Sequence, residues 1–567
     1  MNTIIGDFEY DHPPGEQPRP KCVAWHNVDT GESGKLWLAG HNAPSPFPEK
    51  FRMVAHYAMA ELACFLTLGW PLPDEVIDTL AEARGIRGQV KPPGGGWGLL
   101  PVAQMCGAQT MCCEHKDDMR TLAMLDEVPP DKREELMEYC LDDVKACLAI
   151  WECLSPQMNM PEAILRGRYL KALARVESRG IPADTDLVRK LQVSTDEIKE
   201  TIWAHAREAY PGVINEAGNF VNAGWLEWCS GANIPWPLLP SGQAKLDADT
   251  FKEMGTRYPE VQTMAYAKKL RGQVREHEFP VGEDGRLRCM LAPFGSDTGR
   301  NQPSNSKFIF GASAWLRSVV AAPAGKVLAY VDYSAQEPAI AGYLSSDTAM
   351  MDDYRSGDPY MAFAVRAGAV PDGATKETHP NERATYKVAA LAVQYGMREE
   401  SLAKKLGISI SAARRLITQH QASYPAYWCW RQAVIDTVIC GGSVSTSFGW
   451  QRKGRSKDSG TSIANFPVQA TGAEILRVAI IALEEAGHRV VAPVHDAVLV
   501  ELDEDGWEEE LAEVRQLMSR AAAAVAPSIE IPTDVELVMP GQNYMDKRGA
   551  KFWELVAPII GRAPITG

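Results

Sequence analysis

The sequence lacks any run of about 18 apolar residues, the length that a membrane-spanning helix requires. The runs VAALAV and RVAIIAL are short and soon broken by polar residues. The first residues, MNTIIGDFEY, lack the basic segment and cleavage site of a secretory signal peptide. We therefore expect neither a transmembrane helix nor a signal peptide.

The 12 cysteines show no framework spacing and no C-x-x-C, which predicts reduced thiols in a cytoplasm rather than a disulfide scaffold. With 45% hydrophobic and 23% charged residues, the composition excludes a collagenous or wholly disordered chain. The net charge of −15 argues against non-specific binding to polyanions. It does not exclude a nucleic-acid enzyme, because such an enzyme needs only a local basic channel.

The length of 567 residues predicts three or four domains. Short strands within residues 1–40 are followed by helices over 57–68 and 130–154, which indicates an α/β domain ending near 155. Residues 160–275 read as mostly helical, with a loop-like stretch over 210–245.

A second pattern begins with an apolar strand over 326–332. Further elements are predicted as helices over 381–395, 411–440 (broken at Pro425) and 506–525, and as strands over 489–501 (broken at His495-Asp496) and 529–539. Two Asp-bearing strands separated by a mainly helical insertion predict an antiparallel catalytic sheet.

A first set of carboxylates lies in the N-terminal part. Asp7 and Glu9 form D-x-E at the end of the first expected strand, so both side chains share one face. Glu61 lies in an apolar helix, where a lone carboxylate is costly to bury without a partner or a metal. Tyr139 and Asp143 lie one helical turn apart. Four carboxylates and a tyrosine suit a two-metal phosphodiesterase.

A second set lies in the C-terminal part. Asp332 ends an apolar strand, and Asp496 sits in the turn of Val494-His495-Asp496-Ala497. Between them, four-residue spacing places two cations, an apolar side chain and an aromatic ring in one helical stripe: Arg383, Lys387, Leu391 and Tyr395. A triphosphate could lie on the two cations, with its base near Leu391 and Tyr395.

Taken singly, each pattern has an ordinary explanation. D-x-E can be two surface acids, the stripe can be a solvated basic turn followed by core contacts, and His495-Asp496 can be a polar turn. Their combination and order favour a catalytic interpretation.

The first set resembles the proofreading 3′–5′ exonuclease domain of DNA polymerases, an RNase-H-like fold. The second resembles the core of family A DNA polymerases: DYSAQE matches motif A, the stripe ending in Tyr395-Gly396 matches motif B, and VHDA matches motif C. Further similar segments are Asp297-Thr298-Gly299-Arg300, Arg317 ahead of motif A, Asn465-Phe466-Pro467-Val468-Gln469, and Glu177-Ser178-Arg179-Gly180-Ile181 at the start of the thumb.

The resemblance implies an α/β multidomain chain: an RNase-H-like exonuclease over 1–155 and a polymerase domain over 156–567. Its thumb would span about 160–290, its palm about 291–355 and 460–567, and its fingers about 356–459. The layout is similar to phage-type enzymes, with no 5′-nuclease domain and the host bacterial cytoplasm as location.

The resemblance also implies roles for particular residues. Asp332 and Asp496, with Tyr333, would hold two Mg²⁺ (or Mn²⁺), as would Asp7, Glu9, Glu61 and Asp143 in the nuclease, beside Tyr139. Arg383, Lys387, Leu391, Tyr395, Tyr333 and Glu337 would contact the nucleotide. Glu337 would exclude a 2′-hydroxyl, held by a hydrogen bond from Tyr395, and Lys387 would protonate the leaving group. DNA contacts are expected from Arg300, Arg317, Asn465, Gln469 and His495. The basic residues Lys268, Lys269, Arg271, Arg300 and Arg452 are candidates for phosphate contacts, and the alternative for each is a solvated surface charge.

Three departures from the family pattern stand out. Ala497 replaces the second carboxylate of motif C, Leu391 replaces an aromatic residue, and Glu61 replaces an Asp. The expected partners are primer-template DNA, dNTPs and a single-stranded 3′ end, bound by a monomer without membrane contact. A nuclease whose polymerase half only grips DNA, a non-catalytic scaffold, and a preference for an unusual nucleotide such as 2-aminoadenine stay open.

Overall fold

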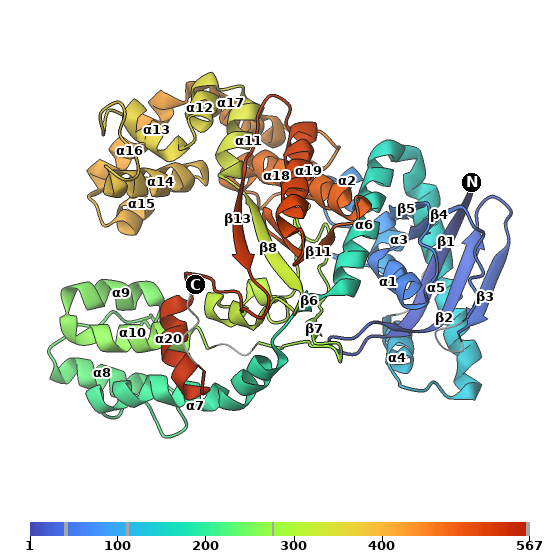
Figure 1. Cartoon of the computed structure of the whole chain (residues 1–567), viewed down its shortest axis with the longest axis horizontal. Helices are drawn as coiled ribbons and strands as arrows, with labels where there is room; N and C mark the ends of the chain where they lie inside the picture. Colours follow the sequence, from blue (N-terminus) through green and yellow to red (C-terminus); the bar gives the residue numbers. More distant parts are fainter. Residues whose placement is uncertain (39–42, 109–112, 275–276, 563–567) are drawn as a thin grey trace. The chain divides into compact units, whose positions relative to one another are not determined.

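The computed structural model describes residues 1–38, 43–108, 113–274 and 277–562 (Figure 1). It divides into two compact units. Unit 1 comprises Met1–Gly180, Met290–Gln302 and Val327–Leu537. Unit 2 comprises Ile181–Cys289, Pro303–Lys326 and the chain from Val538 onward. Packing thus groups residues after 537 with the expected thumb, whereas the sequence pattern assigned them to the palm.

The first sheet of unit 1 has the strand order β3-β2-β1-β4-β5. Strands β1 to β3 are antiparallel neighbours, and β4 and β5 continue the sheet in parallel. The strands are β1 (Asn2–Asp11), β2 (Arg19–Asn27), β3 (Ser33–Trp37), β4 (Phe51–Ala55) and β5 (Glu75–Asp78). The three strands expected before residue 40 are confirmed.

The helices around this sheet cover both of its faces. They are α1 (Met59–Thr67), α2 (Thr79–Ile86), α3 (Leu99–Met105), α4 (Cys113–Ala123), α5 (Arg133–Leu154) and α6 (Met160–Arg179), with short 3₁₀ turns η1 (Pro130–Lys132) and η2 (Ser155–Gln157). Ile5 lies in one apolar cluster with α5, and its neighbour Ile4 lies in the other with α1. The alternation of β1 therefore buries both of its faces.

Helix α6 packs closely against β5 at Gly167. A Cβ atom there would lie 1.8 Å from the Val76 carbonyl oxygen, so only glycine permits this approach.

The second sheet of unit 1 has the order β11-β12-β8-β13. Its strands are β8 (Lys326–Tyr333), β11 (Arg489–Val494), β12 (Ala497–Asp503) and β13 (Thr533–Val538). Helices α11 (Gln336–Ser345), α18 (Gly460–Glu485) and α19 (Trp507–Val525) accompany it. The predicted strand pair around His495-Asp496 is confirmed, and β11 and β12 are antiparallel.

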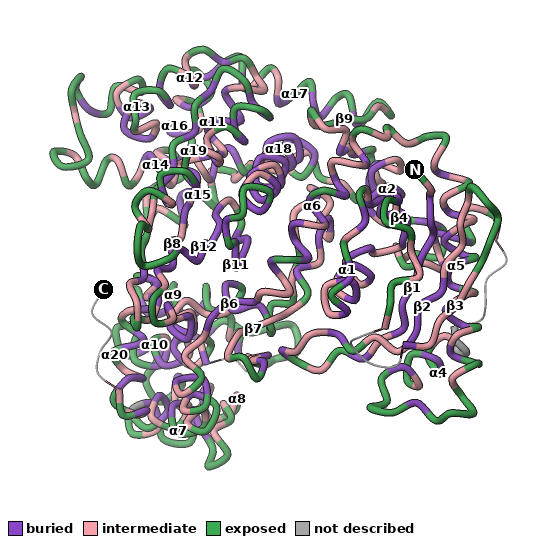
Figure 2. Tube along the Cα trace, turned by 45° about the vertical axis from the view of Figure 1, so that its right-hand side comes forward, coloured by how far each residue is buried: buried purple, intermediate pink, exposed green. Residues whose placement is uncertain are grey.

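Helix α18 is long and apolar enough by composition to cross a membrane, but 78% of that apolar window is buried inside the protein. Figure 2 shows it as buried almost throughout. Burial in the core of unit 1 accounts for its composition.

The segment between α11 and α18 is mainly helical, as expected. Figure 1 shows its helices gathered together beyond α11. They are α12 (Thr348–Arg355), α13 (Pro359–Arg366), α14 (Pro380–Gln394), α15 (Glu399–Leu406), α16 (Ile410–Ser423) and α17 (Pro425–Ile439), followed by the hairpin β9 (Ser443–Ser445) and β10 (Gln451–Lys453). The predicted break at Pro425 separates α16 from α17, because proline starts the second helix.

Unit 2 is helical around an aromatic core that includes Tyr210, Trp225, Trp236 and Phe251. Its elements are α7 (Thr185–Ala209), α8 (Asn222–Gly231), α9 (Ala248–Arg257), α10 (Gln262–Arg271), α20 (Ala550–Ile559), β6 (Ile181–Pro182), β7 (Arg286–Leu287), and the turns η3 (Pro259–Val261), η4 (Ile309–Gly311) and η5 (Ala314–Val319). The expectation of a loop over 210–245 is wrong for α8, where burial of Trp225 stabilises a helix despite its glycines.

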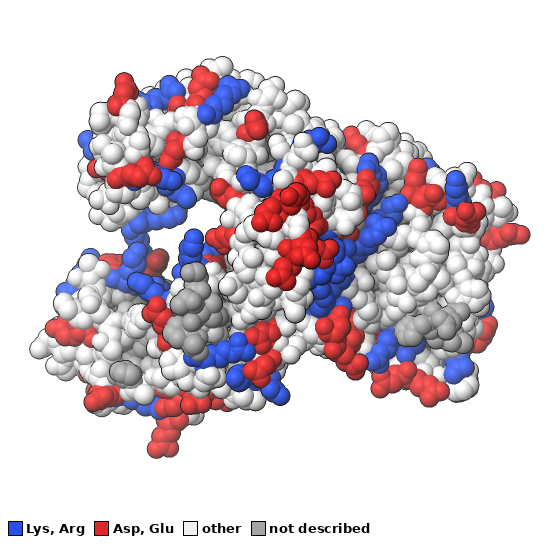
Figure 3. Space-filling model, in the orientation of Figure 1, with Lys and Arg blue, Asp and Glu red and all other residues white. Residues whose placement is uncertain are grey.

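Charges separate locally on unit 1 despite the overall excess of acid. Figure 3 shows Lys and Arg gathered in a stripe along α6, beside a group of Asp and Glu near α19. Helix α6 carries Arg168, Lys171 and Arg175, whereas the first turn of α19 is acidic. The net charge therefore does not describe any one part of the surface. The cysteines whose side chains are described are free thiols, as predicted.

Candidate active sites

Asp332 and Asp496 meet at one end of the second sheet. The backbone N–H of Tyr333 donates to the Asp496 carbonyl at 3.4 Å, which joins the end of β8 to the start of β12. His495 has a φ of 57°, a left-handed conformation that makes the tight turn before Asp496. Both carboxylates thus lie at the ends of strands, at one edge of the sheet, as the motif pattern predicts.

The surroundings of Asp332 fit a divalent cation. Burial, together with the negative charges of Asp496, Asp534 and Glu536, raises the pKa of its carboxyl to about 7. Its Oδ1 atom is buried without a hydrogen-bond partner among the described residues. An orphaned carboxylate oxygen among like charges is the environment that a hard cation with oxygen ligands would relieve.

Two acids of this site were missed from the sequence. Asp534 and Glu536 lie on β13, which borders β8 on the side away from β12. Their alternate spacing gives them one common face. The D-x-E pattern of Asp534-Val535-Glu536, which repeats the pattern at Asp7, was the available signal.

A cleft of about 920 Å³ opens beside these acids. Its lining includes Arg383 and Lys387 from α14, Tyr360 from α13, and Asp534 from β13. Both cations lie over the Tyr360 ring, at 5.8 and 5.4 Å from its centroid. Helix α14 therefore presents its two predicted cations to one concave surface that also contains a carboxylate of the catalytic sheet.

Arg383 already has a partner in this structure, because its Nε donates to Asp358. Asp358 also caps the N-terminus of α13 through the Met361 N–H. An anion that binds Arg383 must share or replace this ion pair.

Glu337 and Tyr395 form the predicted hydrogen bond. The Tyr395 hydroxyl donates to Glu337 Oε1 at 2.5 Å, and Arg300 Nη2 lies 3.7 Å from the same oxygen. Ala335, with a φ of 48°, turns the chain from β8 into α11, so Glu337 points back toward the end of α14. Glu337 and Tyr395 line a small pocket together with Asn465 and Gln469 of α18. Leu391 lies one turn before Tyr395 on α14 and is partly buried.

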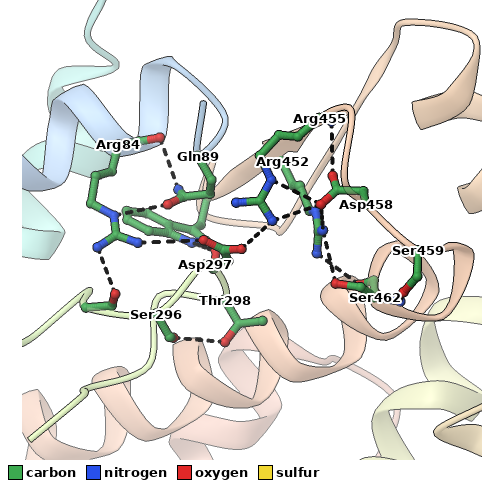
Figure 4. A network of polar contacts seen from close by, with 12 residues as sticks. Arg84, Gln89, Ser296, Asp297, Thr298, Arg452, Arg455, Asp458, Ser459 and Ser462 are labelled. Carbon is green, nitrogen blue, oxygen red and sulfur yellow. Dashed lines mark hydrogen bonds and ion pairs between the residues drawn. The ribbon is translucent and has the colours of Figure 1, made fainter. Parts of the chain in front are cut away.

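The network in Figure 4 holds the loop that precedes Arg300. Arg84 of α2 donates to the Gly295 carbonyl at 2.9 Å, and Arg455 donates to Asp297 Oδ2 at 2.6 Å. Asp458 pairs with both Arg455 and Arg452. These contacts tie helix α2 to two loops of the second half of unit 1.

The other expected DNA contacts differ in accessibility. Lys269 and His495 are exposed and Arg271 is partly exposed. Lys268 donates to the Leu246 carbonyl and lies over two aromatic rings, and burial lowers its pKa to about 8. It is therefore used inside unit 2.

Two expected DNA contacts need correction. Arg317 pairs with Asp546 at 2.8 Å and donates to the Phe310 carbonyl, which leaves 12% of its side chain exposed. Arg452 is 2% exposed and pairs with Asp458 at 2.7 Å. Both guanidinium groups stabilise their own surroundings, which the sequence pattern did not reveal because their partners are provided by other loops.

The first carboxylate set also comes together. Asp7 and Glu9 lie within β1, which continues to Asp11 because it pairs with β2; the expectation that they end the strand is wrong. Asp7 and Glu9 share a face, and ligand atoms of both lie within 4.8 Å of one another and of Cys140 Sγ. Glu61 on α1 and Asp143 on α5 are buried.

Burial among like charges dominates this site. It raises the pKa of Asp7 to about 8 and raises those of Glu9 and Glu61 well above their ordinary values. Glu61 Oε2 and Asp143 Oδ1 are buried without a hydrogen-bond partner among the described residues. Four oxygen donors with orphaned atoms fit divalent metal ions.

Lys116 of α4 is a cation in this site that sequence reasoning missed. Its Nζ lies 2.6 Å from Asp143 Oδ2 and 5.6 Å from the centroid of the ring of Tyr139, which is one of the predicted site residues. One cation offsets only part of the negative charge of four carboxylates. No local pattern around Lys116 identified it.

Comparison with solved structures defines the class of fold. The chain superposes on the polymerase domain of Pol1 from M. smegmatis, solved in complex with DNA primer-template and dNTP, with a TM-score of 0.75 and 19% identity over 97% of this chain and 96% of that one. The fold is therefore the α/β polymerase fold.

The family follows from the sequence comparison. Residues 283–546 match DNA polymerase family A, so the chain carries a family A DNA polymerase domain. It is 25% identical to DNA polymerase I of Pseudomonas aeruginosa over 450 residues, covering 72% of this chain and 48% of that protein. It is 25% identical to DNA polymerase I of Mycobacterium bovis over 537 residues, covering 88% and 56%. The chain thus spans about half the length of these curated relatives.

Proposed function

We propose that the chain is a DNA-dependent DNA polymerase that extends a primer with dNTPs and proofreads through a 3′–5′ exonuclease domain over residues 1–155. The observation that carries the polymerase assignment is the cleft in which Arg383 and Lys387 face the acidic end of the catalytic sheet within the family A domain. This pairing of cations and carboxylates suits a nucleoside triphosphate.

In the proposed reaction, the primer 3′-oxygen bonds to the α-phosphorus of the dNTP. The bond from that phosphorus to the bridging oxygen breaks, pyrophosphate leaves, and the hydroxyl proton passes to solvent. Divalent ions at Asp332 and Asp496 would supply the charge that lowers the pKa of the hydroxyl and neutralises the pyrophosphate. Arg383 and Lys387 hold the triphosphate by charge-assisted hydrogen bonds, and Lys387 donates a proton to the leaving group.

The exonuclease assignment is supported by fold and site together. The order β3-β2-β1-β4-β5, with β1 to β3 antiparallel and β4 and β5 parallel, supports the proposal of an RNase-H-like sheet. The four acids of the first set would hold two divalent ions, whose charge would lower the pKa of a water that attacks the terminal phosphodiester. Tyr139 would orient that water. Glu61, one methylene longer than Asp, would alter the position of one ion.

Further details belong to the same proposal. We expect two Mg²⁺ per site, with Mn²⁺ as a substitute, and a monomer of the phage-type layout acting in a bacterial cytoplasm. Unit 2 would be the thumb, with Lys269 and Arg271 on DNA phosphates. Arg300, Asn465, Gln469 and His495 would contact primer and template.

A second candidate is a DNA-binding exonuclease with an inactive polymerase half. Ala497 favours it, because motif C then lacks its second carboxylate. A 5′-labelled primer-template with Mg²⁺ and four dNTPs separates the two, since the polymerase lengthens the primer and the nuclease only shortens it.

Variants assign each activity to its site. Asp332→Ala should lower extension by several orders of magnitude and leave shortening and DNA binding unchanged. Asp7→Ala with Glu9→Ala should have the opposite effect. If Asp332→Ala keeps a tenth of wild-type extension, the polymerase metals lie elsewhere. If the double variant still degrades a single-stranded primer at the wild-type rate, the nuclease assignment fails.

A further inference from the structure

The catalytic sheet presents only two carboxylates from the motifs themselves. Asp332 and Asp496 offset two charges of the four that a pair of divalent ions would bring. Ala497, the residue after Asp496, offers a methyl group and no ligand. A hard cation such as Mg²⁺ takes six oxygen ligands. Another acidic oxygen beside Asp332 would therefore add both a ligand and a negative charge.

The order of the sheet places such a group beside Asp332. β8 lies between β12 and β13. The Tyr333 N–H donates to the Asp496 carbonyl on the β12 side, and the Ser334 N–H donates to the Pro532 carbonyl at 2.9 Å on the β13 side. Because the end of β8 meets the start of β13, the two strands are antiparallel. Counting back two residues from Ser334 and forward two from Pro532 places Asp534 opposite Asp332.

Side-chain contacts agree with this register. Ser334 Oγ donates to Asp534 Oδ2 at 2.6 Å, so the Asp534 carboxylate lies on the face of β8 that carries Ser334 and Asp332. Asp534 is exposed and lines the same cleft as Arg383 and Lys387. It thus borders the cleft that contains the surface assigned to the triphosphate.

We propose that Asp534 is a third carboxylate ligand of the polymerase metal site and supplies, from β13, the charge that Ala497 lacks. This inference rests on the proposed polymerase function and extends it to a residue outside the three motifs. Asp534 lies on β13 and Ala497 lies on β12, on opposite sides of β8 in the sheet. The third carboxylate therefore approaches Asp332 from the side opposite to Ala497. The ligand class is a divalent cation with oxygen coordination, Mg²⁺ or Mn²⁺.

A different role for Asp534 predicts different behaviour. If Asp534 only accepts the hydrogen bond from Ser334, it orders the end of β8 and acts on metals indirectly. Ser334→Ala would then be as harmful as Asp534→Asn. If Asp534 is a ligand, Ser334→Ala leaves the carboxylate in place.

The test measures Mn²⁺ binding directly, by the loss of the free Mn²⁺ signal in electron paramagnetic resonance. All proteins carry Asp7→Ala and Glu9→Ala, so that the first site contributes no tight binding. Each is held in complex with a dideoxy-terminated primer-template and the matching dNTP. Primer extension is measured in parallel on an ordinary primer. Glu530→Gln, a nearby exposed acid of the segment leading into β13, is the matched control.

Asp534→Asn should weaken Mn²⁺ binding at least tenfold, whereas Glu530→Gln and Ser334→Ala should stay within threefold of the parent. Ala497→Glu added to Asp534→Asn should restore both Mn²⁺ affinity and extension to within about threefold. Unchanged affinity in Asp534→Asn, equal losses in Ser334→Ala, or failure of Ala497→Glu to rescue overturns the inference. If the parent does not extend the primer, the proposed function is overturned instead. The Mn²⁺ titration does not depend on extension, so the two failures are distinguishable.

Discussion

The contact between Glu337 and Tyr395 leads to a specific expectation for sugar selection. Glu337 lies in the first turn of α11 and accepts a hydrogen bond from the Tyr395 hydroxyl at 2.5 Å, while Arg300 Nη2 lies 3.7 Å from the same oxygen. Burial and the Glu337 carboxylate raise the pKa of Tyr395, so the phenol stays protonated and donates. Two partners therefore hold one carboxylate in place, and we expect that place to lie below the sugar of a bound nucleotide.

Replacing Glu337 by Ala removes the carboxyl group and opens space for a 2′-hydroxyl. We expect the preference for dNTP over rNTP to fall about 100-fold, which corresponds to about 2.7 kcal/mol. Tyr395→Phe removes one charge-assisted hydrogen bond, worth about 1.5–3 kcal/mol, but leaves Arg300 in place. It should therefore reduce the preference by about tenfold. Glu337→Gln keeps the size and an acceptor oxygen, and should change the preference less than threefold.

The assay is single-nucleotide insertion in the Asp7→Ala, Glu9→Ala background, with kcat/KM measured for each dNTP and its rNTP. The competing explanation is that Glu337 only interacts with the dipole of α11, an effect worth less than about 1 kcal/mol. That explanation predicts slightly lower stability and an unchanged preference. An unchanged rNTP to dNTP ratio in an active Glu337→Ala enzyme would refute the gate.

Three further outcomes are expected. Lys116→Met removes the partner of Asp143, so the melting temperature in EDTA should fall and Mn²⁺ should restore it; an unchanged melting temperature in EDTA would contradict the pairing. Burial raises the pKa of Glu177 to about 7, so the folded state holds its proton at a pH where the unfolded state has lost it, and stability falls as pH rises from about 4.5 to 7. Glu177→Gln should thus gain on the order of 2 kcal/mol over wild type in urea unfolding at pH 8 and nothing at pH 4. Asp358→Asn keeps a cap for α13 but frees Arg383, so dNTP affinity in a fluorescence titration should rise about threefold, and a weaker affinity would argue against that pair as a competitor.

Much of the local structure could be read from the sequence because its causes are local. Apolar strands, proline breaks and four-residue spacing predicted β8, α14 and the division between α16 and α17. The turn at His495-Asp496 followed from two apolar runs meeting at polar residues. These patterns depend on neighbours within a few residues, so no knowledge of the fold was required.

The ends of helices and strands, and the burial of individual side chains, were predicted less well from the sequence. β1 continues past Glu9 because β2 supplies hydrogen-bond partners up to Asp11, which a single strand cannot indicate. α8 forms in a stretch rich in Trp and Gly because Trp225 is buried among aromatic rings from outside the helix, those of Trp236 and Phe251. The sequence predicted Arg317 as a DNA contact, but in the structure it pairs with Asp546, more than 200 positions later.

The sequence by itself determined which carboxylates and cations the chain offers and the order in which its motifs occur. Only the tertiary structure decided which further charges face them. Lys116 reaches Asp143 from another helix. Asp534 reaches the side of Asp332 across about 200 residues, through the pairing of β8 with β13. Strand order and register are set by the packing of the whole sheet, and no local spacing records which strands become neighbours.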